Sequence, residues 1–152
     1  MIFFVVDIIV LDAADCDGYY SHPAGKLSSP NYPNPYPSLS RCRYRISIPG
    51  STHITINFQD FETEESNDYL YYGSGDQEPS EGLAIGSFTG DMVTRSLMIP
   101  SGSVWFLFTS DMTGNDVGFT LTWDSITTGW FINIVLISST ICLYSTTTLQ
   151  NL

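Results

Sequence analysis

Apolar and polar residues alternate with a period of two through the middle of the chain. The pattern is clearest in four segments: residues 44–48, 54–58, 104–108 and 119–123. Residues 69–72 and 96–99 show a weaker form of it. Alternation of this kind places the apolar side chains on one face of a β-strand, whereas no stretch of the middle has the 3.6-residue period of a helix. The pattern therefore predicts a series of half-buried β-strands.

Turn-forming residues separate these segments, including Pro49-Gly50, the glycines at 73–75 and Gly114-Asn115. Short alternating strands with frequent turns are typical of an antiparallel sandwich or barrel. We therefore predict an all-β fold, an antiparallel β-sandwich. The side chains expected to fill its core are Tyr44, Ile46, Ile56, Phe58, Phe106, Phe108, Phe119 and Leu121.

A proline-rich segment precedes the first of these strands. Residues 28–37, SSPNYPNPYP, contain four prolines and two tyrosines. Proline fixes φ and removes an amide donor, and the residue before each proline is pushed toward extended conformations. The segment is therefore expected to be an ordered surface loop that presents Tyr32 and Tyr36.

The two ends differ from the middle. Residues 1–15 contain a short apolar run without Lys or Arg, which we interpret as a degraded signal-like segment, with a first strand as the alternative. Residues 125–152 carry no charged side chain, and residues 129–145 are about as long as the shortest membrane spans. A membrane anchor and a gene-model artefact are the two interpretations of this apolar tail. The single domain is placed at residues 16–124.

The net charge of the chain limits the classes of partner that it could bind. Sixteen acidic residues stand against five basic ones, a net charge of −11. Nucleic-acid binding through phosphate contacts needs clustered Lys and Arg, so this balance excludes it. An acidic surface suits basic partners or divalent cations, with a merely solvated surface as the alternative.

Enzyme signatures are absent from the sequence. It contains no GxSxG, HExxH, GxGxxG or phosphate-binding loop motif, and His22 and His53 stand alone. We predict that the protein is not an enzyme. A hydrolase that uses paired carboxylates is kept as a hypothesis of a different class.

The chain has three cysteines, Cys16, Cys42 and Cys142, none in a CxxC pair. Cys16 and Cys42 flank the proline-rich loop, so a disulfide between them is reasonable, with two buried unpaired thiols as the alternative. A disulfide would place the protein in an oxidising compartment.

Acidic residues gather in two segments, residues 61–68 (FETEESND) and residues 110–116 (SDMTGND). Each segment is expected to connect two strands. Hard cations take several oxygen ligands from carboxylates and carbonyls, so two such loops at one end of a sandwich could hold one. A solvated acidic edge is the alternative.

Several of these segments together resemble the CUB domain. In order they are Cys16, Gly25, SPNYPNPYP at 29–37, Cys42, IPG at 48–50, ITINF at 54–58, FETEESNDYL at 61–70, GSG at 73–75, FTSD at 108–111 and GFTLTW at 118–123. The resemblance covers about residues 16–124. It implies a jelly-roll-like CUB sandwich and a Cys16–Cys42 disulfide, with Cys142 free.

The resemblance also implies a calcium site, since some members of the family bind Ca²⁺. The matching metal ligands are Glu64, Asp68, Asp111 and the backbone carbonyl of Thr113. Tyr36 would orient one of the carboxylates from behind. The segment before Asp68 is shorter than in many members, so Glu62 and Glu65 are the alternatives to Glu64. A second disulfide of the family is missing, because its positions hold Ser66-Asn67 and Thr89.

The function that the resemblance implies is calcium-dependent protein recognition or adhesion, without catalysis. The implied partner is an extracellular protein that presents Lys or Arg, and the implied location is secreted or on the extracellular face of the plasma membrane. The alternative is a calcium-independent carbohydrate- or glycoprotein-binding module, with Tyr32, Tyr71 and Tyr72 as stacking surfaces.

Overall fold

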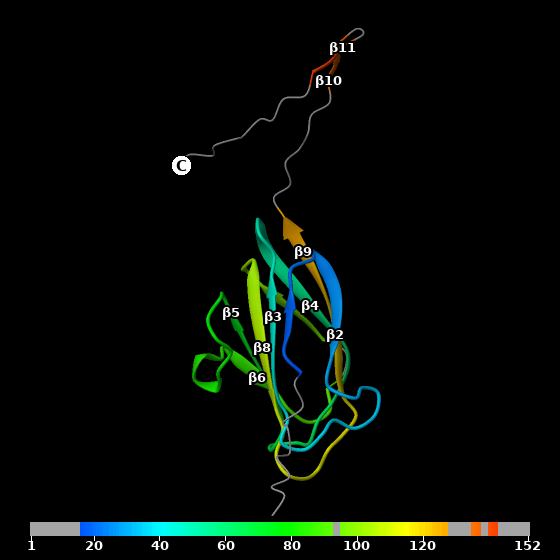
Figure 1. Ribbon diagram of the computed structural model, residues 1–152, viewed down its shortest axis with the longest axis vertical. Coiled ribbons are helices and arrows are strands. Elements are labelled where there is room, and N and C mark those ends of the chain that lie inside the picture. The colour runs from blue at the N-terminus through cyan, green and yellow to red at the C-terminus, as the bar shows by residue number, and fades with distance from the viewer. Residues whose placement is uncertain (1–15, 93–94, 128–134, 138–139, 143–152) are drawn as a thin grey trace, which may run out of the picture.

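The computed structural model describes residues 16–92, 95–127, 135–137 and 140–142 (Figure 1). The strands are β1 (Gly18–Tyr20), β2 (Ala24–Ser28), β3 (Arg41–Ser47), β4 (Ser51–Glu62), β5 (Tyr69–Ser74), β6 (Gly86–Phe88), β7 (Ser96–Ile99), β8 (Ser103–Thr109), β9 (Gly118–Thr127), β10 (Val135–Ile137) and β11 (Thr140–Cys142). One turn of 3₁₀ helix, η1 (Glu81–Leu83), is the only helix in these ranges. None of the described residues forms a helix long and apolar enough to cross a membrane.

Two sheets form the body of the domain. The five-stranded sheet has the order β1-β3-β8-β5-β6, and the four-stranded sheet has the order β2-β9-β4-β7. All pairings are antiparallel except that of β1 with β3, which is parallel. The predicted all-β antiparallel sandwich is therefore confirmed. Strands β10 and β11 form a separate two-stranded pair.

The core lies between the two sheets and is rich in aromatic rings. All eight residues expected to fill it are buried. Phe119 of the four-stranded sheet contacts Tyr44 and Phe108 of the five-stranded sheet, with ring centroids 6.3 and 5.4 Å apart. Edge-to-face contacts of this kind add to the free energy gained by removing the rings from water. The alternating pattern thus identified the inner faces correctly.

Strand β8 is buried on both faces, which a period of two does not predict. Trp105 and Leu107 point to the outer face of the five-stranded sheet, yet they are only 1% and 0% exposed. The indole of Trp105 lies against Gly73 of β5, where a side chain larger than hydrogen would overlap the ring. Because β8 is central in the sheet and Gly73 has no side chain, the large outward side chain of Trp105 can be covered.

Several predictions concern residues outside the described ranges. The signal-like segment at 1–15 lies there entirely. Most of residues 129–145, which we considered as a membrane anchor, also lie there, apart from β10 and β11. Both interpretations stay predictions.

Candidate metal centre

Three loops meet at one end of the sandwich. Glu62 at the end of β4 pairs with Gly118 at the start of β9, so the loops 63–68 and 110–117 leave the sheet side by side. The proline-rich loop joins them, because the backbone N–H of Tyr36 donates to the carbonyl of Asp116 and that of Leu39 donates to the carbonyl of Asp111. These loops gather at the lower end of the molecule in Figure 1.

The three predicted carboxylate ligands come together in this loop cluster. Glu64, Asp68 and Asp111 each offer a carboxylate oxygen, and these oxygens all lie within 4.8 Å of one another. Asp68 is fully buried, whereas the other two keep contact with solvent. Glu62 and Glu65, the alternatives to Glu64, do not belong to the cluster. The geometry therefore favours Glu64 as the third carboxylate.

Tyr36 holds the buried carboxylate in place. Its side chain is 1% exposed, and its hydroxyl donates to Oδ2 of Asp68 at 2.5 Å and accepts from the backbone N–H of Glu64 at 3.0 Å. Burial raises the pKa of Tyr36 well above its usual value, and the hydrogen bond to Asp68 raises it further. The phenol therefore stays protonated and acts as a fixed donor.

The second oxygen of Asp68 ties this residue to the opposite loop. Oδ1 of Asp68 accepts from the backbone N–H of Asp111 at 2.8 Å. Oδ1 of Asp111 in turn accepts from the backbone N–H of Thr113 at 2.8 Å. Thr113 is thus close to the cluster and exposed, and the role of its carbonyl as a metal ligand stays a prediction. Among the described residues, Asp68 and Asp111 thus accept hydrogen bonds from neutral donors only.

Glu64 carries an unsatisfied oxygen. Oε2 of Glu64 is buried and has no hydrogen-bond partner within the described residues. A buried carboxylate oxygen without a partner costs free energy, so such an atom in a native site calls for an explanation such as a bound ion or water. Three convergent carboxylates with an orphan oxygen fit the all-oxygen coordination that Ca²⁺ takes.

Two residues of the cluster were not identified from the sequence. Gly114 has φ of +75°, and a side chain there would overlap the carboxylate of Glu64. The side-chain amide of Asn115 donates to the carbonyl of Tyr36 at 2.7 Å and to Oγ of Ser38 at 3.0 Å. In the sequence this Gly-Asn pair signals only a turn. Its contacts with the proline-rich loop depend on how the two loops are aligned in the fold, which the local sequence does not indicate.

The disulfide between Cys16 and Cys42 is present, with Cα atoms 5.0 Å apart, which confirms that prediction. The positions of the family's missing second disulfide are joined in another way. Oγ1 of Thr89 accepts from the backbone N–H of Ser66 at 2.9 Å and donates to the carbonyl of Glu64 at 3.1 Å. A single hydroxyl therefore links the two segments beside the candidate metal centre.

The three tyrosines proposed as a sugar-stacking surface do not lie together. The hydroxyl of Tyr32 donates to Oδ2 of Asp60 at 2.9 Å. Tyr72 is parallel to Phe88 with ring centroids 5.2 Å apart and packs against the core. Tyr71 points to the other face of β5, as the alternation along a strand requires. The geometry gives no support to a binding surface made of these three residues.

Comparison with known proteins agrees with this architecture. The CUB domain family model matches residues 16–123. Cubilin from Canis lupus familiaris is 33% identical over 138 residues, which are 86% of this chain and 4% of cubilin. Tolloid-like protein 2 from Mus musculus is 34% identical over 110 residues, 70% of this chain and 11% of that protein. The chain thus spans a small part of these relatives.

Solved structures of CUB domains are also similar to this chain. The MASP-1 CUB2 domain bound to Ca²⁺ is 28% identical, with a TM-score of 0.60, and the match covers 70% of this chain and 96% of that one. The CUB1-EGF-CUB2 domain of human MASP-1/3 is also 28% identical, with a TM-score of 0.65, over 74% of this chain and 43% of that one. With its family model, disulfide, sandwich and loop cluster in agreement, the chain belongs to the CUB domain family.

Proposed function

We propose that this CUB domain is an extracellular, calcium-dependent protein-recognition module. The observation that carries the proposal is the carboxylate cluster of Glu64, Asp68 and Asp111 with the buried, unpartnered oxygen of Glu64. The disulfide supports an oxidising, extracellular location. A related CUB structure is described as bound to Ca²⁺, which supports the choice of metal.

A bound calcium ion would serve the domain in two ways. It would offset the mutual repulsion of three carboxylates that the fold forces together. It would also connect the 63–68 loop to the 110–117 loop through Asp68 and Asp111, in addition to the hydrogen bond from the backbone N–H of Asp111 to Oδ1 of Asp68. The loop end is therefore expected to become more rigid when calcium binds.

The partner that suits this end is a protein that presents a Lys or Arg side chain. Carboxylates held by a metal and by fixed donors can still accept hydrogen bonds from an ammonium or guanidinium group, and such bonds are strong because they are charge-assisted. Two exposed apolar side chains stand beside Asp111: Leu39 is 50% exposed and Met112 is 74% exposed. They would contact the aliphatic stem of the incoming basic side chain.

A calcium titration of the oxidised protein tests the metal site. We expect binding in the range of roughly 10⁻⁴–10⁻³ M, typical of extracellular modules, with a matching rise in melting temperature. Asp111→Ala removes one of the clustered carboxylates and should abolish the response. Glu65→Ala, which removes an exposed neighbouring acid outside the cluster, is the matched control and should keep it.

Tyr36→Phe refines the test. It removes the hydrogen bond that orients Asp68 but leaves every carboxylate in place, so calcium affinity should fall modestly. Calorimetry that shows no heat with millimolar calcium would refute the metal site and leave a solvated acidic edge as the explanation.

A further inference from the structure

Two adjoining cavities lie on the outer face of the five-stranded sheet, where β1 runs beside β3. Their volumes are about 250 and 300 Å³, and both are lined by Tyr19 and Arg45. Neither contains any residue of the carboxylate cluster. We call the pair the β1–β3 groove, and its polar lining residues are Asp17, Tyr19, Arg43, Arg45, Ser47, Asp76 and Glu78.

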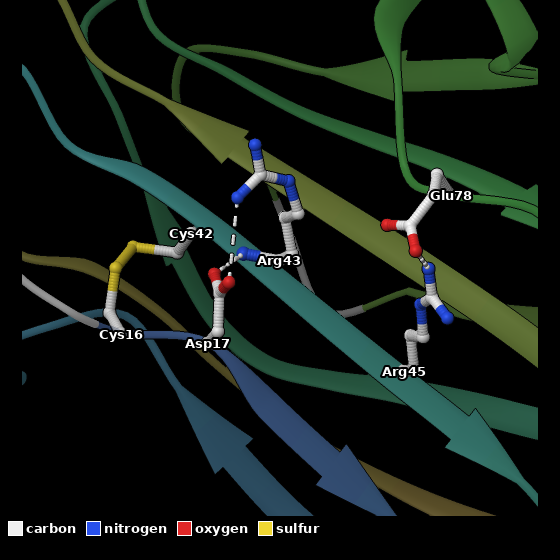
Figure 2. Close-up of polar contacts among 6 residues, drawn as sticks. All are labelled: Cys16, Asp17, Cys42, Arg43, Arg45 and Glu78. Atoms are coloured by element: carbon white, nitrogen blue, oxygen red, sulfur yellow. Dashed lines mark hydrogen bonds and ion pairs between the residues drawn. A yellow bond between two sulfur atoms is a disulfide. The ribbon is translucent and has the colours of Figure 1, made fainter.

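Two arginines of β3, Arg43 and Arg45, line this groove. Arg41, Arg43 and Arg45 alternate along the strand and so share its outer face. They are three of the five basic residues in the chain. Figure 2 shows the guanidinium groups of Arg43 and Arg45 on the same side of β3, with an acidic side chain reaching each of them from a neighbouring segment.

Each guanidinium in the groove already has an acidic partner. Arg43 pairs with Asp17 at 3.4 Å, and Arg45 pairs with Glu78 at 2.5 Å. Asp17 also accepts from the backbone N–H of Arg43 at 2.6 Å, which fixes its carboxylate beside the strand. The carboxylate of Asp17 is therefore held in position before any ligand arrives.

This arrangement disfavours anionic ligands. An anion would have to compete with Asp17 and Glu78 for the two guanidinium groups. A neutral ligand with several hydroxyl groups avoids that cost. Guanidinium has five N–H donors and carboxylate about four acceptor sites, so each ion pair keeps free donors and acceptors for hydroxyl groups.

Tyr19 supplies the apolar contact that a polyhydroxylated ring needs. It lines both cavities and is 69% exposed, the second most exposed of the large apolar side chains among the described residues. A tyrosine ring offers a broad apolar face at the small entropic cost of two rotatable bonds. The C–H face of a sugar can pack on such a ring while its hydroxyl groups reach the ion pairs.

We propose that the β1–β3 groove binds a neutral sugar residue, with Tyr19 under the ring and the two ion pairs around its hydroxyl groups. The site is distinct from the calcium end and does not use the metal. It also differs in residues from the three tyrosines Tyr32, Tyr71 and Tyr72, which the structure separates.

A ¹H–¹⁵N NMR titration tests the proposal. The oxidised protein, with EDTA present, is titrated with glucose, galactose, mannose and N-acetylglucosamine at on the order of 1–50 mM, the range of weak single-sugar affinities. At least one should shift resonances confined to residues 17–19, 43–47 and 75–78. Glucuronate, matched in size but anionic, should bind more weakly than the best neutral sugar.

Substitutions of the tyrosine complete the design. Tyr19→Ala should weaken binding by roughly tenfold or more, because it removes the stacking face. Tyr19→Phe keeps that face and should keep the affinity. Tyr69→Ala removes a tyrosine on β5, three strands away from β1 in the same sheet. It is the matched control and should also keep the affinity. Absence of shifts with every sugar, preference for glucuronate, or unchanged binding by Tyr19→Ala would overturn the proposal.

Discussion

At the scale of single residues, Tyr36 organises the candidate metal centre. Its hydroxyl connects Asp68 to the backbone of Glu64, and its own carbonyl accepts the amide of Asn115. The proline-rich loop therefore acts as a rigid support that places a phenol behind a carboxylate. The family motif could predict Tyr36, Asp68 and Asp111 because each sits in a fixed sequence signature.

Gly114→Ala tests the part of the centre that the sequence did not reveal. A methyl group there would overlap the carboxylate of Glu64, so calcium affinity should fall by about tenfold or more. Gly50→Ala is the matched control, since φ at Gly50 is +77° with no neighbour within 4 Å of the added carbon. Both variants carry the same backbone strain, about 1–2 kcal/mol. A calcium affinity of Gly114→Ala equal to that of Gly50→Ala would contradict the contact with Glu64.

Buried phenols set the response of the domain to alkali. Burial raises the pKa of both Tyr36 and Tyr44 above the usual value of 10, with the bond to Asp68 adding to the effect at Tyr36. Above pH 10 the unfolded chain loses these protons while the folded chain keeps them, so the unfolded state binds fewer protons. The free energy of unfolding should therefore be constant below pH 10 as far as these groups are concerned, and should fall as pH rises above it.

Urea titrations at a series of pH values around and above 10 measure this slope. Tyr44→Phe should reduce the slope, because it removes one of the buried phenols. A slope that Tyr44→Phe does not alter would assign the alkaline loss of stability to other groups.

At the scale of single elements, alternation predicted the long strands, was weaker in β5 and β7, and missed the three-residue strands β1 and β6. Strands β3, β4, β8 and β9 have seven or more residues each, so a period of two is visible in them. Strands β1 and β6 have three residues each, too few to show any period. They form because neighbouring strands supply backbone hydrogen-bond partners. Those partners are brought close only by the tertiary fold, so a local sequence pattern does not indicate them.

Buried and exposed side chains of the strands should differ strongly in their contribution to the free energy of unfolding. Phe106→Ala removes a fully buried ring from the space between the sheets and should lower the free energy of unfolding by about 3–5 kcal/mol. Met98→Ala, at a side chain that is 62% exposed on β7, should change it by less than about 0.5 kcal/mol. Urea denaturation measures both. A loss below about 1 kcal/mol for Phe106→Ala would contradict its burial.

At the scale of the whole molecule, the sequence predicted the class of fold and left the strand order to the family resemblance. Turn signals and alternation indicate an antiparallel sandwich, but β3 pairs with β8 and β2 pairs with β9, partners far apart in the sequence. Local sequence patterns do not indicate which distant strands pair. The approach of Glu64, Asp68 and Asp111 to one another could be predicted because the family motif includes segments from both distant loops.

The Cys16–Cys42 disulfide is expected to contribute strongly to stability. It closes a segment with a sequence separation of 26 residues, and removing that constraint from the unfolded chain should cost about 3–4 kcal/mol. The double variant Cys16→Ser with Cys42→Ser should therefore unfold at lower urea concentration than the oxidised protein. Non-reducing peptide mapping checks the pairing, and a Cys42–Cys142 link would contradict it.

The register of β4 with β9 also determines how the domain would carry a mechanical load. Gly118 of β9 lies at the carboxylate end, and Thr127 lies at the opposite end beside Ser51 (Figure 1). A partner held by the carboxylates and a tether attached after Thr127 would pull along the axis of β9. Because β9 is hydrogen-bonded on both sides, to β2 and β4, and antiparallel bonds run across the strands, this pull shears many bonds at once. Forced unfolding follows the unfolding rate, so the domain should hold a ligand under tension longer than the same sheet peeled from its edge.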